Sequence, residues 1–306
     1  MATSGSTNYT RSRNELLNGA LRLIGKSGRG KTASAADISD ASEALELMVK
    51  AWQASGVHLW KLKEATLFVT KGTASYSLPG ANCTHNYVET DIKVAGVATD
   101  LTIDVDSITG LTTGDYIGIA LDDGTSHWTT INGAPAGDTV TITDALPSSV
   151  AIDNKVYAYT TQIVRPLRVV DARRNDSSDI PVEVVSRQEY YDLPNKTATG
   201  SVNQVYYDPQ LTTGALKIWP TGSTAIDKVG LTLMMPIEDF DASDNNADFP
   251  QEWLKAIKWN LAADLGPEYG LDLRRQTYID ARARKFLEDV SDFDAEGASV
   301  YFEVEE

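Results

Sequence analysis

Residues 249–270, FPQEWLKAIKWNLAADLGPEYG, carry the clearest amphipathic pattern in the chain. At 100° per residue, four aliphatic side chains fall on one stripe: Leu254, Ile257, Leu261 and Leu265. Pro250 suits a first helical turn, because the N–H that it lacks would have no partner there, and Asp248 is in position to cap the helix. The Gly266-Pro267 pair interrupts the pattern, and Gly270 ends a short continuation of the helix through Glu268 and Tyr269. This pattern predicts an amphipathic helix.

Two tryptophans of this helix point to different surfaces. Trp253 and Trp259 are six residues apart, which leaves them about 120° from alignment at 100° per residue. One apolar stripe cannot bury both rings. We therefore expect them to be divided between the core of the subunit and an interface, with Trp259 favoured for the interface.

Helical spacing recurs near both ends of the sequence. Ser12 and Glu15 have the spacing of a capping box, in which each side chain bonds a free backbone N–H of the first turn. Ser34 and Asp37 begin a second helix in the same way. A final helix is expected over about 272–288.

From residue 64 the hydrophobic period changes to two, which is typical of strands. Residues 64–70 and 74–78 flank a Lys71-Gly72 turn and are interpreted as a β-hairpin. Short β-branched segments separated by turn residues then follow: Leu101–Val105, Tyr116–Ala120, Thr125–Ile131, Thr139–Thr143 and Lys155–Thr160. They predict a small all-β domain inserted at 86–161. The alternative is a long β excursion that is continuous with the sheet of the host domain.

Strands and one short helix are expected after the insert. The second capping box, Ser186 with Glu189, predicts the helix. Val202–Tyr207 and Ala215–Trp219 are expected to pair around a turn. Three further apolar segments predict strands: Leu167–Asp171, Pro181–Val185 and Val229–Met235.

Composition narrows the possible functions. The net charge of −16 repels phosphate backbones, so sequence-independent nucleic-acid binding is not expected, although a polyanion could slide past an acidic wall. Cys83 is the only cysteine, which excludes an internal disulfide and a zinc site built from cysteines. No apolar run approaches the length of a membrane span, and the first residues lack the apolar stretch of a signal peptide. We expect assembly in the cytoplasm and no membrane partner.

The octet Gly25–Thr32, GKSGRGKT, matches the phosphate-binding pattern G-x-x-x-x-G-K-[ST]. That chemistry needs a strand before the loop and a helix after it. The preceding residues have helical spacing, so a basic turn between two helices is the simpler interpretation. Nucleotide binding remains the alternative, and equilibrium binding of ATP would test it.

No catalytic or metal-binding constellation emerges from the remaining residues. The acidic run Asp239-x-Asp241-x-x-Asp244 resembles a calcium loop but lacks its glycine and its final glutamate. No Ser/His/Asp or Cys/His arrangement can be selected by spacing. We expect no enzyme activity, no cofactor and no bound metal.

The final helix combines a basic stripe with an acidic continuation. Arg274, Arg275, Arg282 and Lys285 fall within a 100° sector. From Glu288 to residue 306 there are eight carboxylate side chains and no basic one. This arrangement indicates charge pairing with a partner or between copies; an ordinary solvated helix face is the alternative.

Several stretches, in order, resemble one family: the head-to-tail adaptors of short-tailed bacteriophages, also called tail accessory or packaged-DNA-stabilisation proteins. They are 45–52 (LELMVKAW) with Gly56 and Leu59-Trp60, Tyr76–Pro79, Ser186–Tyr191, Leu193–Lys196 with Gly200, Tyr206–Gln210 with Gly214, Trp219-Pro220, Glu238–Asp241, and Phe249–Gly270. The resemblance covers most of residues 12–285, without the insert and the acidic tail.

The resemblance implies an α+β fold with a helical adaptor core, built by helices from both ends of the chain, with β-hairpins and the inserted all-β domain. The expected divisions are 1–85 and 162–288 for the two parts of the core, 86–161 for the insert, and 289–306 for the acidic tail.

The resemblance also implies a function. The protein would be a structural virion component that forms a ring, expected to have twelve copies. The ring would dock on the portal after DNA packaging, continue the DNA channel, help to retain packaged DNA and provide a platform for the tail nozzle and tail fibres. DNA would pass through without sequence-specific binding.

Candidate contacts follow from this assignment. The portal-contact candidates are Arg274, Arg275, Arg282, Lys285, Tyr301 and Phe302. The subunit-interface candidates are Trp253 and Trp259, and the fibre or nozzle candidates on the insert are Tyr116 and Trp128. Two other functions stay open: a peptidoglycan-degrading enzyme of the tail, and a tail component that binds carbohydrate or a fibre through the β insert.

Overall fold

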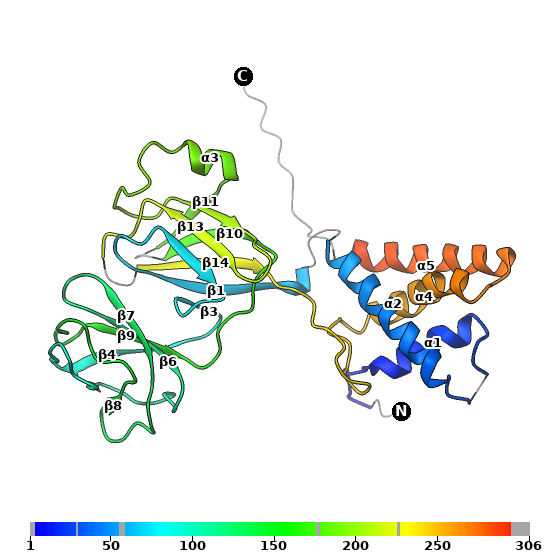
Figure 1. Cartoon of the computed structure of the whole chain (residues 1–306), viewed down its shortest axis with the longest axis horizontal. Helices are drawn as coiled ribbons and strands as arrows, with labels where there is room; N and C mark the ends of the chain where they lie inside the picture. Colours follow the sequence, from blue (N-terminus) through cyan, green and yellow to red (C-terminus); the bar gives the residue numbers. More distant parts are fainter. Residues whose placement is uncertain (1–3, 29, 55–58, 176–177, 225–226, 295–306) are drawn as a thin grey trace. The chain divides into compact units, whose positions relative to one another are not determined.

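Helices form where the sequence alternates at a helical period near either end of the chain, and strands fill the sequence between them (Figure 1). The computed structural model describes residues 4–28, 30–54, 59–175, 178–224 and 227–294. Contacts divide the chain into two units. We call residues 1–61 and 236–306 the helical unit, and residues 62–235 the β unit.

The described part of the helical unit consists of four α-helices and one short 3₁₀ turn. They are α1 (Arg13–Leu23), α2 (Ala35–Ala54), η1 (Leu59–Lys61), α4 (Trp253–Glu268) and α5 (Leu273–Phe293). The capping box of Ser12 and Glu15 is confirmed at the start of α1. Ser34 accepts a hydrogen bond from the backbone N–H of Asp37 at 3.2 Å, as expected for the start of α2. These starts are local in sequence, which explains why they were predictable.

An aromatic cluster holds the start of α4 in place. Trp253 is 2% exposed, and its ring lies 5.9 Å from the rings of both Trp52 and Phe249 and 6.3 Å from that of Trp60. Asp248 does not cap the helix as predicted. It instead pairs with the buried Lys61 and accepts from the backbone N–H of Glu238 at 3.0 Å.

The end of α4 agrees with the prediction, with Tyr269 as the C-cap and Gly270 following at a φ of +66°. The helix continues through Gly266 and Pro267 to Glu268. The close packing of α5 accounts for the glycine, because a Cβ on Gly266 would lie 1.9 Å from Oε1 of Gln276. Gln276 donates to the carbonyl of Ala263 at 3.0 Å and so joins the two antiparallel helices.

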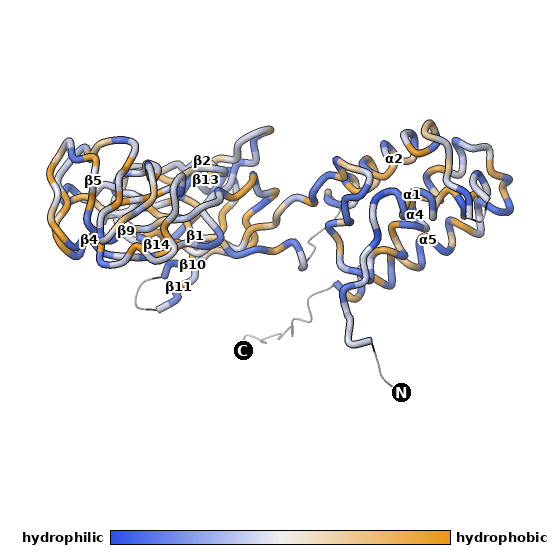
Figure 2. Tube along the Cα trace, turned by 90° about the horizontal axis from the view of Figure 1, so that it is seen from below, coloured by the Kyte–Doolittle hydropathy of each residue, from blue (hydrophilic) through white to orange (hydrophobic). Residues whose placement is uncertain are grey.

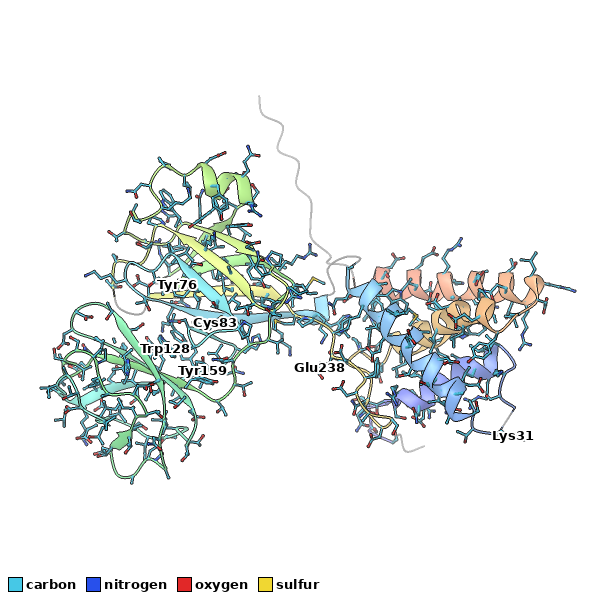
Figure 3. All side chains as sticks on the ribbon, in the orientation of Figure 1. Lys31, Tyr76, Cys83, Trp128, Tyr159 and Glu238 are labelled. Carbon is cyan, nitrogen blue, oxygen red and sulfur yellow. The ribbon has the colours of Figure 1, made fainter. Side chains whose placement is uncertain are left out.

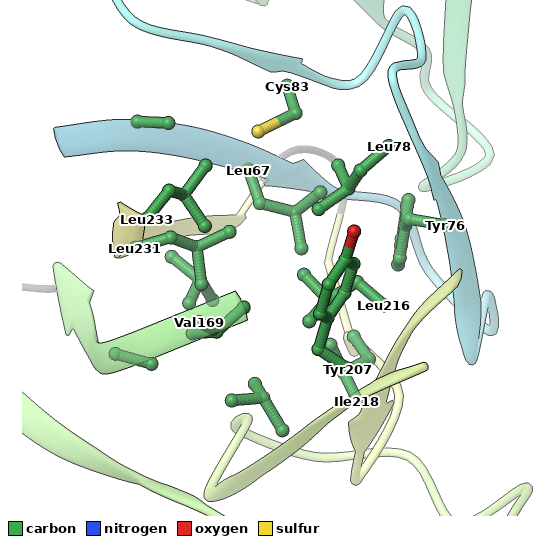
Figure 4. Packing of buried hydrophobic residues seen from close by; sticks show 14 of the residues in the cluster. Leu67, Tyr76, Leu78, Cys83, Val169, Tyr207, Leu216, Ile218, Leu231 and Leu233 are labelled. Carbon is green, nitrogen blue, oxygen red and sulfur yellow. The ribbon is translucent and has the colours of Figure 1, made fainter. Parts of the chain in front are cut away.

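The β unit contains an eight-stranded sheet in the order β2-β13-β12-β11-β10-β14-β1-β3. Its strands are β1 (Leu62–Val69), β2 (Ser75–Leu78), β3 (Cys83–Thr84), β10 (Arg168–Asn175), β11 (Asp179–Val184), β12 (Gln204–Asp208), β13 (Gly214–Trp219) and β14 (Asp227–Met234). The predicted pairing of β12 with β13 is confirmed. The predicted capping box Ser186–Glu189 is also confirmed, at the start of α3 (Arg187–Asp192). Figure 4 shows aliphatic and aromatic side chains of this sheet packed together, with Tyr207 and Leu67 among them.

The predicted β-hairpin of residues 64–78 is wrong. β1 pairs with β14 on one side and with β3 on the other, while β2 pairs with β13 at the sheet edge. Both edges of β1 are therefore occupied by strands other than β2. The turn itself forms, with Gly72 at a φ of +73°.

A second sheet has six strands in the order β7-β6-β9-β4-β5-β8. Its strands are β4 (Val88–Val94), β5 (Thr102–Val105), β6 (Tyr116–Ala120), β7 (Ser126–Thr130), β8 (Thr139–Thr141) and β9 (Lys155–Tyr159). All of its pairings are antiparallel. It encloses a separate core of aliphatic side chains, including Ile92, Ile117 and Val140.

The fold class predicted from sequence is wrong. The α+β description placed a helical core at the centre and treated β-hairpins and a small all-β domain as additions. Strands instead dominate the described chain, in sheets of eight and six strands, and the helices belong to a separate unit. The physical reason is that residues 162–235, expected to belong to the helical core, complete the large sheet around β1 and β14.

Candidate functional site

The final helix, α5, presents a stripe of exposed basic side chains. Asp272 caps the helix by accepting from the backbone N–H of Arg275 at 3.1 Å. Ile279 and Ala283 are the buried positions of α5, and Asn260 of α4 donates to the carbonyl of Ala283 at 3.1 Å. This packing leaves the opposite face outward, and Figure 2 shows hydrophilic and hydrophobic residues alternating along the helix.

Four residues form what we call the α5 stripe: Arg274, Tyr278, Arg282 and Lys285. All four side chains are exposed, and the guanidinium of Arg282 lies 5.6 Å from the centroid of the Tyr278 ring. Within the described chain, none of the three cations has a carboxylate oxygen within 4 Å. Sequence reasoning missed Tyr278, although it falls between Arg274 and Arg282 on a helical wheel.

Arg275 has a different environment from the rest of the basic sector. Its Nη2 donates to the carbonyl of Leu23 at 2.7 Å, at the end of α1. Gly25, with a φ of +85°, lies against the same guanidinium, since a Cβ there would be 3.1 Å from Nη1. Arg275 therefore joins α5 to α1. Tyr301 and Phe302, the other two portal-contact candidates, lie outside the described residues.

The two tryptophans of α4 are in different environments. Trp253 is in the core of the helical unit. Trp259 is half-buried, and its ring packs edge-on against Tyr278 at 6.3 Å and Phe286 at 5.7 Å. Trp259 thus supports the helix that carries the α5 stripe and keeps part of its ring accessible.

The two candidates on the insert, Tyr116 and Trp128, lie on one face of the six-stranded sheet. Trp128 packs 5.3 Å from Phe68 of β1 and 6.0 Å from Tyr159 (Figure 3). Tyr116 stacks on Tyr159 at 5.2 Å, and the hydroxyl of Tyr159 donates to the carbonyl of Ala81 at 2.8 Å. Trp128 therefore packs between the two sheets, and Tyr116 stacks on Tyr159, whose hydroxyl bonds the segment that precedes β3.

A shallow pocket of about 410 Å³ opens beside Trp128. Hydroxyl and amide side chains line it, among them Thr70, Ser77, Asn82 and Ser126. The indole N–H of Trp128 is buried and has no hydrogen-bond acceptor among the described residues. Burial raises the pKa of the Tyr76 hydroxyl, at the same pocket, to about 12.

Two sequence motifs suggested a binding site: the octet Gly25–Thr32 and the acidic loop around Asp239. The octet Gly25–Thr32 follows α1, so the strand that phosphate-binding loops require is absent from the described residues before it. In the acidic loop, Asp239 pairs with Lys50 of α2. No group of three or more His, Cys, Asp or Glu in the described chain is arranged to bind one metal ion. Likewise, none of the described helices is long and apolar enough to cross a membrane.

Comparison with known proteins identifies no family. No protein-family model and no curated protein matches the chain. A solved structure, the Gp54 tailspike of Acinetobacter baumannii bacteriophage AP22 in complex with A. baumannii capsular saccharide, is similar over 24% of this chain and 14% of its own. The identity is 12% and the TM-score 0.22, a likeness too low to carry an argument about fold or function.

Proposed function

We propose that the protein is a structural component of a bacteriophage virion, a head-to-tail adaptor that docks on the portal and provides a platform for the tail. The α5 stripe is the observation that carries this proposal. Its three cations have no carboxylate oxygen within 4 Å in the described chain, and they surround Tyr278, whose side chain is 56% exposed. Arg and Tyr are enriched among the residues that dominate protein–protein binding energy.

The charge of the stripe specifies the chemistry of the partner. Exposed arginines bind carboxylates in pairs of hydrogen bonds, so the complementary portal surface would be acidic. Such contacts at an interface rim mainly accelerate association and weaken as salt rises. The adaptor would bind as a ring, expected to have twelve copies, with the partly accessible Trp259 as the candidate contact between subunits. Packaged DNA would pass through without specific binding.

Mixing the full chain with the portal of the same phage tests the proposal. Native mass spectrometry should detect a portal complex that carries several copies of this chain. The charge-reversal variant R274E/R282E/K285E should lose that complex, because the like charges now repel an acidic surface.

A matched variant controls for the change in net charge. K63E/K71E/R168E reverses three exposed cations of the β unit and should bind portal as the parent does. Equal loss in both variants would mean that overall charge, and not the stripe, determines binding. Unimpaired binding by R274E/R282E/K285E would exclude the stripe as the contact.

A second candidate function, carbohydrate binding by the β unit, is favoured by the pocket at Trp128. Sugars stack on indole rings and hydrogen-bond with hydroxyl and amide groups, and this pocket offers the half-buried ring of Trp128 beside hydroxyl and amide side chains. This function is tested by titrating the full chain with capsular oligosaccharides of candidate hosts and monitoring tryptophan fluorescence. Saturable binding that S126A/N82A abolishes supports it, and an unchanged signal with all oligosaccharides excludes it.

A further inference from the structure

A cleft of about 730 Å³ lies in the helical unit between α1 and α4, a volume typical of sites that bind small molecules. Five cations line it: Arg11, Arg22, Lys31, Lys255 and Lys258. Among the described lining residues Glu15 is the one carboxylate, so the lining carries a net charge of +4. A chain with a net charge of −16 therefore has a strongly basic concave surface.

Four of the five cations have no carboxylate partner. Glu15 pairs with Arg11 at 2.8 Å. Within the described residues, the other lining cations have no carboxylate oxygen within 4 Å: Arg22, Lys31, Lys255 and Lys258. Unpaired cations around one concave surface attract an anion.

Lys258 shows that the charges of the cleft act at one place. Its aliphatic stem crosses α1 at Gly19, where a Cβ would lie only 3.2 Å from Cε of the lysine. Desolvation, followed by the charges of Arg22 and Arg11, lowers the pKa of Lys258. Cations from α1, from α4 and from the residues before α1 are thus close enough to repel one another, and an anion between them would offset that repulsion.

This convergence favours a compact anion over an acidic peptide. A chain of phosphates carries its negative charges on directly adjacent groups. The carboxylates of an extended peptide project to one side only at every second residue, about 7 Å apart. A phosphate chain therefore places more charge within the reach of cations that surround a single cleft.

The charge of the remaining chain favours a small ligand over a nucleic acid. Because the cleft contributes +4 to the total of −16, the rest of the chain carries −20. Salt screens exposed charges beyond about 8 Å at physiological ionic strength, so a ligand held in the cleft interacts mainly with the cleft. A long polyanion would also meet the acidic surface outside it.

The octet contributes to the cleft without forming a strand–loop–helix phosphate site. Lys31, labelled in Figure 3, and Thr32 line the cleft from the turn that follows α1. Their ammonium and hydroxyl groups donate hydrogen bonds, which phosphate oxygens accept. Tyr9 and the half-buried Trp259 add aromatic surface to the same lining, on which a nucleotide base can stack.

We propose that the cleft binds a compact phosphate-chain anion, either the triphosphate of a nucleotide or inorganic polyphosphate. Arg22, Lys31 and Lys258 donate hydrogen bonds to the phosphate oxygens, and Lys255 adds a fourth positive charge. This inference depends on the cleft and not on the α5 stripe, so it holds or fails separately from the adaptor role.

Isothermal titration calorimetry of the full chain with ATP and with inorganic triphosphate tests the proposal. The chain is used without portal, so that no ring contact covers Trp259. We expect saturable binding whose Kd rises with salt, because ions screen the charges. R22Q/K258Q should weaken binding by about tenfold or more, because charge-assisted hydrogen bonds are lost. R22Q/K31Q should have a similar effect, and it retains the packing of Lys258 on Gly19 in case the first variant misfolds.

The two ligands distinguish the two sources of a phosphate chain. Tighter binding of ATP than of triphosphate assigns the site to a nucleotide, and W259L should then reduce the advantage of ATP. Equal or tighter binding of triphosphate assigns the site to inorganic polyphosphate. Either result supports the proposal.

The matched control K63Q/R168Q removes the same charge from exposed positions of the β unit and should bind both ligands as the parent does. Saturable binding of neither ligand, binding that R22Q/K258Q leaves unchanged, or equal weakening in K63Q/R168Q overturns the proposal. Tighter binding of a glutamate peptide than of triphosphate assigns the cleft to an acidic partner and also overturns it. So does binding of single-stranded DNA, sensitive to R22Q/K258Q, when neither small ligand binds.

Discussion

Two groups of basic residues, one on each unit, differ in their surroundings. In the β unit, Lys155 lies 2.7 Å from Asp91 and 3.4 Å from Glu89, and Lys228 lies 3.2 Å from Glu89 and 5.4 Å from the centroid of the Tyr157 ring. These cations satisfy contacts inside the unit. In the helical unit, the three cations of the α5 stripe have no carboxylate oxygen within 4 Å in the described chain.

This difference indicates which charges are available to other molecules. A cation that already has a carboxylate neighbour gains little from a second one, because binding must first break or share the existing pair. An unpaired cation loses only its hydration. The α5 stripe is therefore a better candidate for interaction than the lysines around Glu89 and Asp91.

The largest predicted effect concerns the separate cores of the two units. Trp253→Ala should destabilise the helical unit by about 3–5 kcal/mol, because it removes a buried indole that contacts three other aromatic rings. Every residue of that core belongs to the helical unit. Calorimetry should show a transition of the helical unit moved to lower temperature and a β-unit transition in its original place.

Leu47→Ala provides the control, since Leu47 of α2 is 65% exposed and should shift neither transition measurably. A single transition that moves as a whole in Trp253→Ala would show that the two units unfold together, and would remove the basis for comparing them.

The second prediction perturbs the β unit. A Cβ at Gly118 would lie 2.4–2.6 Å from ring atoms of Trp128, so Gly118→Ala forces the indole to move. Overpacking of this kind typically costs about 1–3 kcal/mol. Chemical denaturation measures this cost. Hydrogen exchange should show weaker protection of the backbone amides in β6 and β7 and unchanged protection in α4.

Gly28→Ala is the matched control, because the nearest atom to its added Cβ is 3.7 Å away on the flexible Lys31. Stability of Gly118→Ala within about 0.5 kcal/mol of the parent would mean that Trp128 has room to rotate, and would weaken its assignment to the packing between the sheets.

Local features of the fold were predictable and long-range features were not. Both capping boxes, Ser12–Glu15 and Ser186–Glu189, depend on four consecutive residues, and both form as predicted. The predicted cap of α4 was wrong because Asp248 pairs with Lys61, which is 187 residues away in sequence. β4 was missed, although Val88, Thr90, Ile92 and Val94 alternate with charged residues at a strand period.

The fold class was predicted wrongly for the same physical reason, because contacts between distant parts of the sequence decide it. Nothing near β1 in the sequence indicates that its partner is β14, about 165 residues later. The three cations of the α5 stripe could be predicted because a helical wheel needs only local sequence. The pocket beside Trp128 could not, because it joins residues 70–82 to Ser126 and Trp128.

A third prediction compares one paired and one unpaired lysine. Lys155→Met should cost about 0.2–1 kcal/mol at low salt, since it leaves Asp91 without its cation and Glu89 with Lys228 alone. Lys285→Met, at an exposed position of α5, should change stability by less than about 0.5 kcal/mol. Urea denaturation at low and high salt measures both, and the Lys155 effect should shrink as salt rises. An equal loss in the two variants would contradict the proposed difference between the units.

The smallest predicted effect concerns Asp264 of α4, whose negative charge disfavours the folded state of the helical unit. Desolvation, followed by the charges of Glu268 and Asp280, raises the pKa of Asp264 above its ordinary value of 3.8. A raised pKa means that the folded state binds the proton more tightly, so this contribution favours folding below pH 3.8 and is lost as pH rises through the folded-state pKa.

Asp264→Asn should therefore stabilise the helical unit near neutral pH by about 0.2–0.5 kcal/mol, the size expected for removing a like-charge pair four residues apart. Glu268→Gln should give a smaller gain, because it removes only one of the two neighbouring charges. Thermal unfolding from pH 3 to 7 measures both variants, and a gain for Asp264→Asn that persists unchanged below pH 3.8 would show that the carboxylate charge is not its cause.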